Sequence, residues 1–220
     1  MFREIFKLLA KDNLQVQALN QCYEMVDICH RMVLASVESL RRRDDAAVDI
    51  DIYEMDKKLN AFERGVRRKV MTHLSLGYTA DIGSGLTLVS VVIDIERIGD
   101  YSKNIHDLAV NHPTRLTGGP LEETLQVIEK EALAVFSDAV RDFKTGNMDE
   151  ARRLMSTYKD NISGPCSEFT KALVGGKVEL PSAEAAALAL YVRFLKRVAA
   201  HSRNLISSLV NPFDRIGYAE

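Results

Sequence analysis

Apolar residues return every three or four positions through most of this chain, in long runs separated by short clusters of Gly and Pro. This spacing is typical of helices that bury one face, and no segment shows the sustained alternation of a strand. The runs predict six helices, each of a length that suits an elongated bundle. These helices cover residues 13–43, 46–75, 80–111, 121–144, 148–174 and 182–210. The predicted fold is therefore all-α, with six long antiparallel helices.

The third and sixth helices share a polar pattern when the sequence is shifted by 100 positions. The matching pairs are Arg97 and Arg197, Ser102 and Ser202, Lys103 and Arg203, and Asn104 and Asn204. Internal repetition of this kind indicates a duplicated structural unit. We therefore expect two tandem three-helix bundles in pseudo-twofold repeat, residues 1–112 and 120–220, joined by a linker that contains Gly118-Gly119-Pro120.

The fifth predicted helix contains a local conflict at Gly164-Pro165. A proline inside a helix removes one backbone hydrogen bond and its ring clashes with the preceding turn. We expect this helix to bend or break there.

The first ten residues are amphipathic. In a helix, Phe2, Ile5, Phe6 and Leu9 would share one side. This face is predicted to pack on the protein or on a second copy, and a frayed terminus is the alternative. Charge runs through the apolar part and a small-residue cleavage site is missing, so we do not expect a signal peptide.

Composition narrows the class of protein further. Among 220 residues, 29 Lys and Arg stand against 31 Asp and Glu, which gives a net charge of −2. That balance argues against a protein that coats nucleic acid. The three cysteines have no metal-ligand spacing and suit a reducing compartment. No apolar run reaches the roughly 18 residues that span a bilayer, so we expect a soluble, cytoplasmic protein.

The densest polar patch lies around Asp100 on the third predicted helix. Glu96, Asp100 and Asn104 are spaced i, i+4, i+8 and so lie on one stripe. The second helix offers a partner stripe of Asp56, Asn60 and Glu63. Oxygen ligands from two adjacent helices suit a hard or borderline cation such as Mg, Mn or Fe. The alternative is an acidic face balanced by basic side chains such as Arg97 and Lys103.

Other reaction centres find little support in the sequence. The five histidines form no His-Glu-x-x-His or Glu-x-x-His arrangement, which weakens a di-iron interpretation. Gly83-Ser84-Gly85 precedes a helix but lacks the Lys-Ser/Thr ending of a phosphate loop. No nucleophile with a neighbouring base is visible, and we do not expect an enzyme.

Residues 93–105 read Ile-Asp-Ile-Glu-Arg-Ile-Gly-Asp-Tyr-Ser-Lys-Asn-Ile and resemble the signature of the PhoU family, regulators of bacterial phosphate uptake. Residues 53–70 resemble the second-helix pattern of that family, and residues 211–218 are similar to the tails of PhoU-like chains. The resemblance covers essentially the whole chain, because a duplicated three-helix unit is the architecture of the family.

The resemblance also implies a metal site. Some PhoU-like proteins bind metal clusters through Glu/Asp-x-x-x-Asp motifs, and Glu96 and Asp100 match that motif. Asp56 is the partner that the resemblance suggests on the second helix, and Glu63 lies on the same stripe. The predicted ligand set is therefore Asp56, Glu63, Glu96 and Asp100, holding a divalent or trivalent ion (Fe, Mn, Mg or Zn).

The second half departs from this motif. Lys196 stands where Glu96 does, and Ala200 stands where Asp100 does. A cation is therefore expected on the first bundle only.

The function that the resemblance implies is that of a non-catalytic cytoplasmic regulator. It would restrain phosphate uptake and phosphate-starvation signalling through contacts with the ATPase or membrane subunits of a phosphate transporter and with a sensor histidine kinase. It would meet the membrane only through these partners, with a homodimer as one candidate assembly. Two alternatives stay open: a metal-binding or di-metal redox bundle, and an accessory subunit of another ion transporter.

Overall fold

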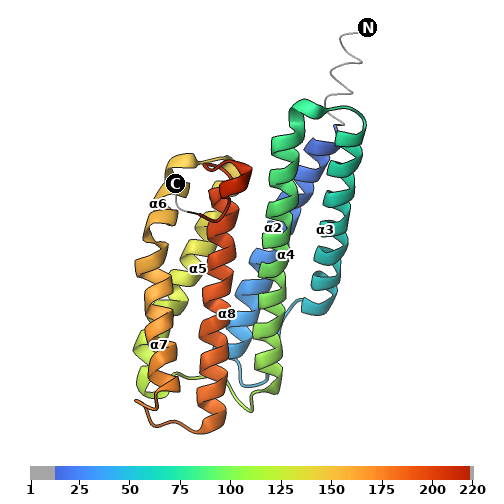
Figure 1. Ribbon diagram of the computed structural model, residues 1–220. Helices are drawn as coiled ribbons and strands as arrows, with labels where there is room; N and C mark the ends of the chain where they lie inside the picture. Colours follow the sequence, from blue (N-terminus) through green and yellow to red (C-terminus); the bar gives the residue numbers. More distant parts are fainter. Residues whose placement is uncertain (1–12, 219–220) are drawn as a thin grey trace.

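The computed structural model describes residues 13–218, and all the regular secondary structure in this part of the chain is helical. The helices run in the order α2 (Leu14–Arg42), α3 (Ile52–Ser75), α4 (Ile82–Asn111), α5 (Glu122–Thr145), α6 (Met148–Tyr158), α7 (Gly164–Val174) and α8 (Ser182–Ser207). Helices α2, α3 and α4 form one three-helix bundle, and α5, α6–α7 and α8 form the other (Figure 1). The predicted all-α fold of two tandem three-helix bundles is confirmed. The amphipathic segment of residues 1–10 lies outside the described residues.

Side chains at the helix ends explain where the helices begin. Asn13 accepts a hydrogen bond from the backbone N–H of Gln15 at 2.7 Å and caps α2. Asp51 caps α3 in the same way, and Asn147 caps α6. Asn and Asp are favoured at this position because their side-chain oxygens satisfy N–H groups that have no partner within the helix. At the other end of α5, Gly146 adopts φ 68°, a left-handed conformation that glycine accepts without strain.

The predicted interruption of the fifth helix is confirmed. A π-helical turn, η3 (Lys159–Ser163), joins α6 to α7, so that Pro165 falls in the first turn of α7. Because proline has no backbone N–H, it cannot take part in the regular α-helical hydrogen-bond pattern, and here the wider π-helical turn directly precedes it. Lys196 of α8 supports the junction by donating to the carbonyl oxygen of Ser163 at 3.3 Å and to Ser167 Oγ at 2.9 Å.

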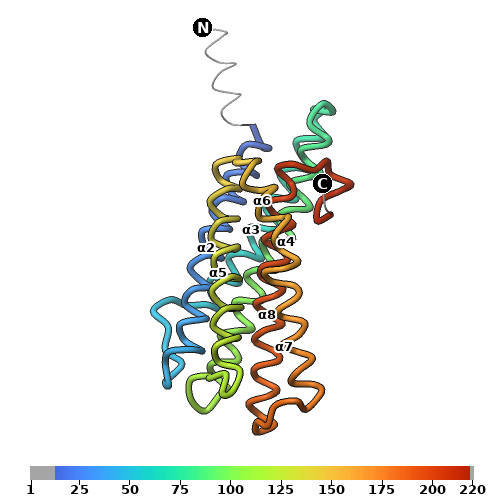
Figure 2. The backbone as a smooth tube through the Cα atoms, turned by 90° about the vertical axis from the view of Figure 1, so that its left-hand side faces the viewer, coloured from blue at the N-terminus to red at the C-terminus, as the bar shows by residue number. Residues whose placement is uncertain are grey.

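The two bundles are joined along a seam in which α4 packs on α8 and α2 packs on α5. Buried apolar residues from both bundles belong to one contiguous core. Figure 2 shows the helices of the two bundles running side by side along most of the molecule. The seam therefore fixes the faces of α4 that remain available to other molecules.

Arg41 fixes the linker at the end of the molecule where α2 ends. Its guanidinium forms ion pairs with Glu122 at 2.6 Å and with Glu129 at 2.9 Å, and it also donates to the carbonyl oxygen of Leu116. Glu129 accepts a further hydrogen bond from the Tyr191 hydroxyl at 2.7 Å. This one buried arginine therefore connects the first bundle, the linker and two helices of the second.

Candidate functional site

The spacing of the polar patch on α4 places its acidic residues on different sides of the helix. Successive residues are rotated by about 100°, so Asp94 and Glu96 are about 200° apart while Glu96 and Asp100 nearly coincide. The contacts agree with this geometry, since Asp94 bonds to α8 and the other two lie on the side of α3. The patch thus contributes side chains both to the seam between the bundles and to the face that α4 shares with α3.

Gly99 lies within this patch and permits close packing against α3. A Cβ atom at this position would lie 2.3 Å from Leu59 Cδ1 and 3.8 Å from Cys29 Sγ. Leu59 is itself buried in the core of the bundle. The glycine of the Glu-Arg-Ile-Gly-Asp sequence is therefore explained by helix packing.

The structure brings all four predicted metal ligands to the adjoining faces of α3 and α4. Each of them lies near a basic side chain. Asp56 Oδ2 lies 2.9 Å from Lys103 Nζ, and the same ammonium lies 3.8 Å from Asp100 Oδ1. Asp100 Oδ2 lies 2.8 Å from Arg97 Nη1, whose Nε lies 3.7 Å from Glu96 Oε2.

Glu63 completes the set. Its carboxylate pairs with Arg67, one turn further along α3, at 2.8 Å. We call Asp56, Glu63, Glu96 and Asp100 the acidic cluster.

Glu96 carries the clearest sign that these carboxylates influence one another. Its pKa is raised, first because burial penalises the charged form and then because Asp100, Glu63 and Asp56 are negative, while Arg97 opposes the shift. For Lys103, burial alone would lower the pKa, but the hydrogen bond and charge of Asp56 outweigh it and the pKa is raised. Negative charge is therefore concentrated here and is partly neutralised by basic side chains.

The chemistry of the acidic cluster suits a hard cation, but its arrangement in this structure is that of an ion-pair cluster. Among residues 13–218, no three Asp, Glu, His or Cys side chains converge on a point where they could hold a metal ion. A cation would have to displace the ammonium of Lys103 and the guanidinium of Arg97 from their carboxylates. Metal binding by the four residues stays a prediction.

The second bundle has a different electrostatic character. Lys196 occupies the position that corresponds to Glu96, and its ammonium is bound by oxygens of Ser163 and Ser167.

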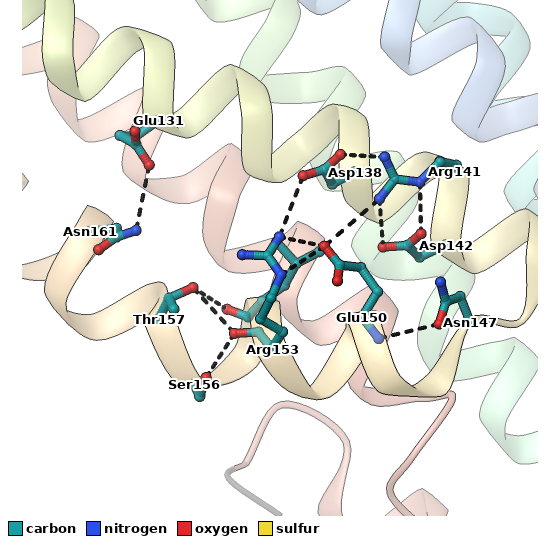
Figure 3. A network of polar contacts seen from close by, with 11 residues as sticks. Glu131, Asp138, Arg141, Asp142, Asn147, Glu150, Arg153, Ser156, Thr157 and Asn161 are labelled. Atoms are coloured by element: carbon teal, nitrogen blue, oxygen red, sulfur yellow. Dashed lines mark hydrogen bonds and ion pairs between the residues drawn. The ribbon is translucent and has the colours of Figure 1, made fainter.

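Three acidic residues of α5 and α6, Asp138, Asp142 and Glu150, form ion pairs with arginines (Figure 3). Arg141 lies between Asp138 and Asp142 at 2.6 and 2.9 Å, and Arg153 pairs with Glu150. Asp142 is completely buried, so this network has a structural role between α5 and α6.

The sequence did not reveal the polar group that joins the two bundles. His201 Nδ1 lies 2.7 Å from Asp94 Oδ1, and Asn204 donates to the same oxygen at 3.0 Å. Arg197 Nη2 lies 3.1 Å from His201 Nε2. Because a guanidinium only donates, Nε2 must accept and Nδ1 must carry the proton given to Asp94.

The internal repeat could have indicated that α4 and α8 meet near His201. Tyr101 and His201 are equivalent positions under the shift of 100 residues, and their rings stack across the seam with centroids 5.8 Å apart. Arg197 also donates to the Tyr101 hydroxyl at 3.2 Å. Repeat-equivalent positions on α4 and α8 thus face each other, as expected near a pseudo-twofold axis.

Comparison with known proteins shows what the first bundle, which carries the acidic cluster, is similar to. Residues 22–109, which span most of α2 and all of α3, and α4 up to its last turn, match the PhoU domain. Residues 22–109 are thus similar to the PhoU domain. The predicted resemblance to the PhoU family is confirmed over this range, which includes all four residues of the acidic cluster.

Two curated relatives extend the match. The phosphate-specific transport system accessory protein PhoU homolog of Xylella fastidiosa strain Temecula1 / ATCC 700964 is 27% identical over 156 residues, which cover 69% of this chain and 61% of the relative. The homolog of strain 9a5c is also 27% identical over 156 residues, with 62% of the relative covered. The match thus spans less than two thirds of the length of either relative.

Solved PhoU structures share the fold of nearly the whole chain. The crystal structure of PhoU from Pseudomonas aeruginosa superposes with a TM-score of 0.75 and 19% identity, covering 90% of this chain and 96% of the other. The phosphate transport system regulatory protein PhoU from Streptococcus pneumoniae gives a TM-score of 0.67 and 19% identity, covering 92% and 94%. In this PhoU-like chain, no helix among the described residues is long and apolar enough to cross a bilayer.

Proposed function

We propose that this chain is a non-catalytic accessory protein of a phosphate transport system and restrains phosphate uptake by binding to the transporter. The observation that carries the proposal is the PhoU domain at residues 22–109, in a chain whose fold follows solved PhoU proteins along nearly its whole length. The names of the two curated relatives specify phosphate as the substrate of the transport system. Contact with the ATPase subunit of the transporter would place the chain in the cytoplasm.

The structure offers extended surfaces for such contacts. Two bundles share one core and are joined by buried polar pairs, so the molecule presents long helical faces in a fixed relation to each other. The face of the first bundle carries alternating charge, with Arg97 exposed beside Asp100 and Lys103 beside Asp56. Charge patterns of this kind favour specific recognition of a partner with complementary charges.

The test is a deletion of the gene in its own organism, grown with abundant phosphate. If the chain restrains uptake and signalling through a transporter and a sensor histidine kinase, the deletion strain will express phosphate-starvation genes despite the phosphate, and an intact gene copy will restore repression. Unchanged starvation-gene expression and unchanged phosphate uptake would contradict the proposal. A change in the uptake of a different ion, with phosphate uptake unaffected, would instead favour an accessory subunit of another ion transporter.

A further inference from the structure

An apolar groove lies at the end of the molecule where α2 and α4 begin and α5 and α8 end. Its volume is about 570 Å³, within the range of cavities that hold sizeable ligands. Helices α2, α4 and α5 and the segment that follows α8 contribute apolar side chains to its walls. The principal ones are Val16, Leu19, Tyr23, Leu88, Phe143 and Leu209.

The groove leaves apolar surface open to water. Val16 is 42% exposed, and Leu19 and Tyr23 are only half-buried, although they lie beside the fully buried core residues of α2. Gln15 also lines the groove, and its Nε2 donates to Ser84 Oγ at 2.6 Å. The Gln15 side-chain oxygen is buried and has no hydrogen-bond donor among the residues that the structure describes. The groove thus offers both an apolar surface and an unused acceptor.

Asn13, the first residue that the structure describes, lies at the groove. Asn13 has an extended conformation, φ −60° and ψ 127°, and its side chain caps α2, so the helix begins directly after this residue. Asn13 itself lines the groove. Residues 1–12 precede Asn13 in the sequence, and a chain of that length reaches at most about 40 Å when extended.

The sequence of residues 1–12 complements this surface. Phe2, Ile5, Phe6 and Leu9 recur at the spacing of one helical face. A segment tethered beside an apolar groove has a high effective concentration there, on the order of millimolar for a short linker. We propose that the groove is the docking site for the apolar face of residues 1–12 of the same chain.

The chain contains no tryptophan, so one introduced tryptophan reports on this segment alone. We would replace Phe6→Trp and record its emission maximum in the full chain at low protein concentration. The emission is expected at shorter wavelength than that of a free tryptophan derivative in water. Adding Val16→Asp in the groove is expected to shift the emission to longer wavelength, because the charge disfavours apolar contact.

Val127→Asp is the matched control. Val127 is also an exposed valine on a helix, at 59%, but it lies on α5 outside the groove, so this change should leave the emission where it was. Circular dichroism would check that each protein is folded, and Val16→Ser with Val127→Ser would replace the pair if an aspartate variant failed to fold.

Three results would overturn the proposal. The first is emission of a fully solvated tryptophan in the folded Phe6→Trp protein. The second is an equal effect of the Val16 and Val127 changes. The third is a short-wavelength emission that is lost on dilution together with a dimer seen by sedimentation, which would assign the groove to a second copy. None of these results bears on phosphate uptake, so the proposed function is tested separately.

Discussion

At the scale of single residues, Glu96 is the carboxylate whose environment most favours the protonated form. Burial raises its pKa above the ordinary glutamate value, and the other three residues of the acidic cluster add to the shift. A carboxyl group with a raised pKa in the folded state loses stabilising free energy as the pH rises from its ordinary pKa through the folded value. At neutral pH, the charged Glu96 side chain therefore lowers the free energy of unfolding.

We expect Glu96→Gln to be more stable than the wild type at pH 7 and the difference to shrink as the pH falls below the ordinary glutamate pKa. Glutamine keeps the size of the side chain but removes the charge that Asp100 and Asp56 repel. Urea unfolding at several pH values measures this, with the exposed Glu24→Gln as control. A variant equally or less stable than the wild type at pH 7 would show that the pairing of Glu96 with Arg97 outweighs burial and repulsion.

The same residues determine where a cation could bind. Any bound metal is predicted on the first bundle, because Lys196 would place a positive charge beside a cation on the second, and Ala200 has no oxygen ligand. The repulsion between two unit charges at 4 Å is about 4 kcal/mol at an effective dielectric constant near 20. Elemental analysis should show that Asp100→Ala lowers the metal content of the purified protein while Lys196→Ala leaves it unchanged. Equal metal content in Asp100→Ala and wild type would remove Asp100 from the site.

At the scale of the helices, Gly99 sets the distance between α4 and α3. In Gly99→Ala the new methyl group would meet Leu59 at 2.3 Å, and Leu59 is surrounded by the core. Overpacking of this kind costs about 1–3 kcal/mol of the free energy of unfolding. Urea denaturation should show such a loss.

Gly83→Ala is the matched control on the same helix. Nothing lies within 4 Å of a Cβ atom at Gly83, so alanine should cause no loss of stability there. If both variants were equally stable, close packing would not explain the glycine in the Glu-Arg-Ile-Gly-Asp sequence.

The positions of the helices could largely be predicted from the sequence, because they depend on local patterns. Apolar spacing located the helices, and Gly164-Pro165 located the interruption that becomes the π-helical turn before α7. The role of Arg41 could not be predicted in this way. It pairs with Glu122, 81 positions away, and only the folded chain brings the two together.

At the scale of the whole molecule, Asp94 connects the two bundles through His201 and Asn204. Asp94 stands two positions before Glu96 in the sequence, and the helical rotation turns it toward α8. The sequence shows which side chains are polar, but the hydrogen-bond partners of a buried polar side chain such as Asp94 depend on how α4 and α8 pack. This is why the seam was not foreseen although the repeat was.

Asp94→Ala should lower the free energy of unfolding of the whole chain by about 1–3 kcal/mol, since it leaves His201 and Asn204 without their buried acceptor. Because both bundles share one core, unfolding should remain a single transition. Asp149→Ala is the control, since the Asp149 side chain is fully exposed on α6. An Asp94→Ala protein as stable as the control would mean that apolar packing alone holds the bundles together.

The proposed function requires this chain to bind to a phosphate transporter. The most direct measurement is the binding of the purified chain to inverted membrane vesicles from its own organism, which present their cytoplasmic face. We predict saturable binding to vesicles that contain the phosphate transporter and loss of that binding in vesicles from a strain that lacks it. Equal binding to both kinds of vesicle, or binding to neither, would contradict the proposed function.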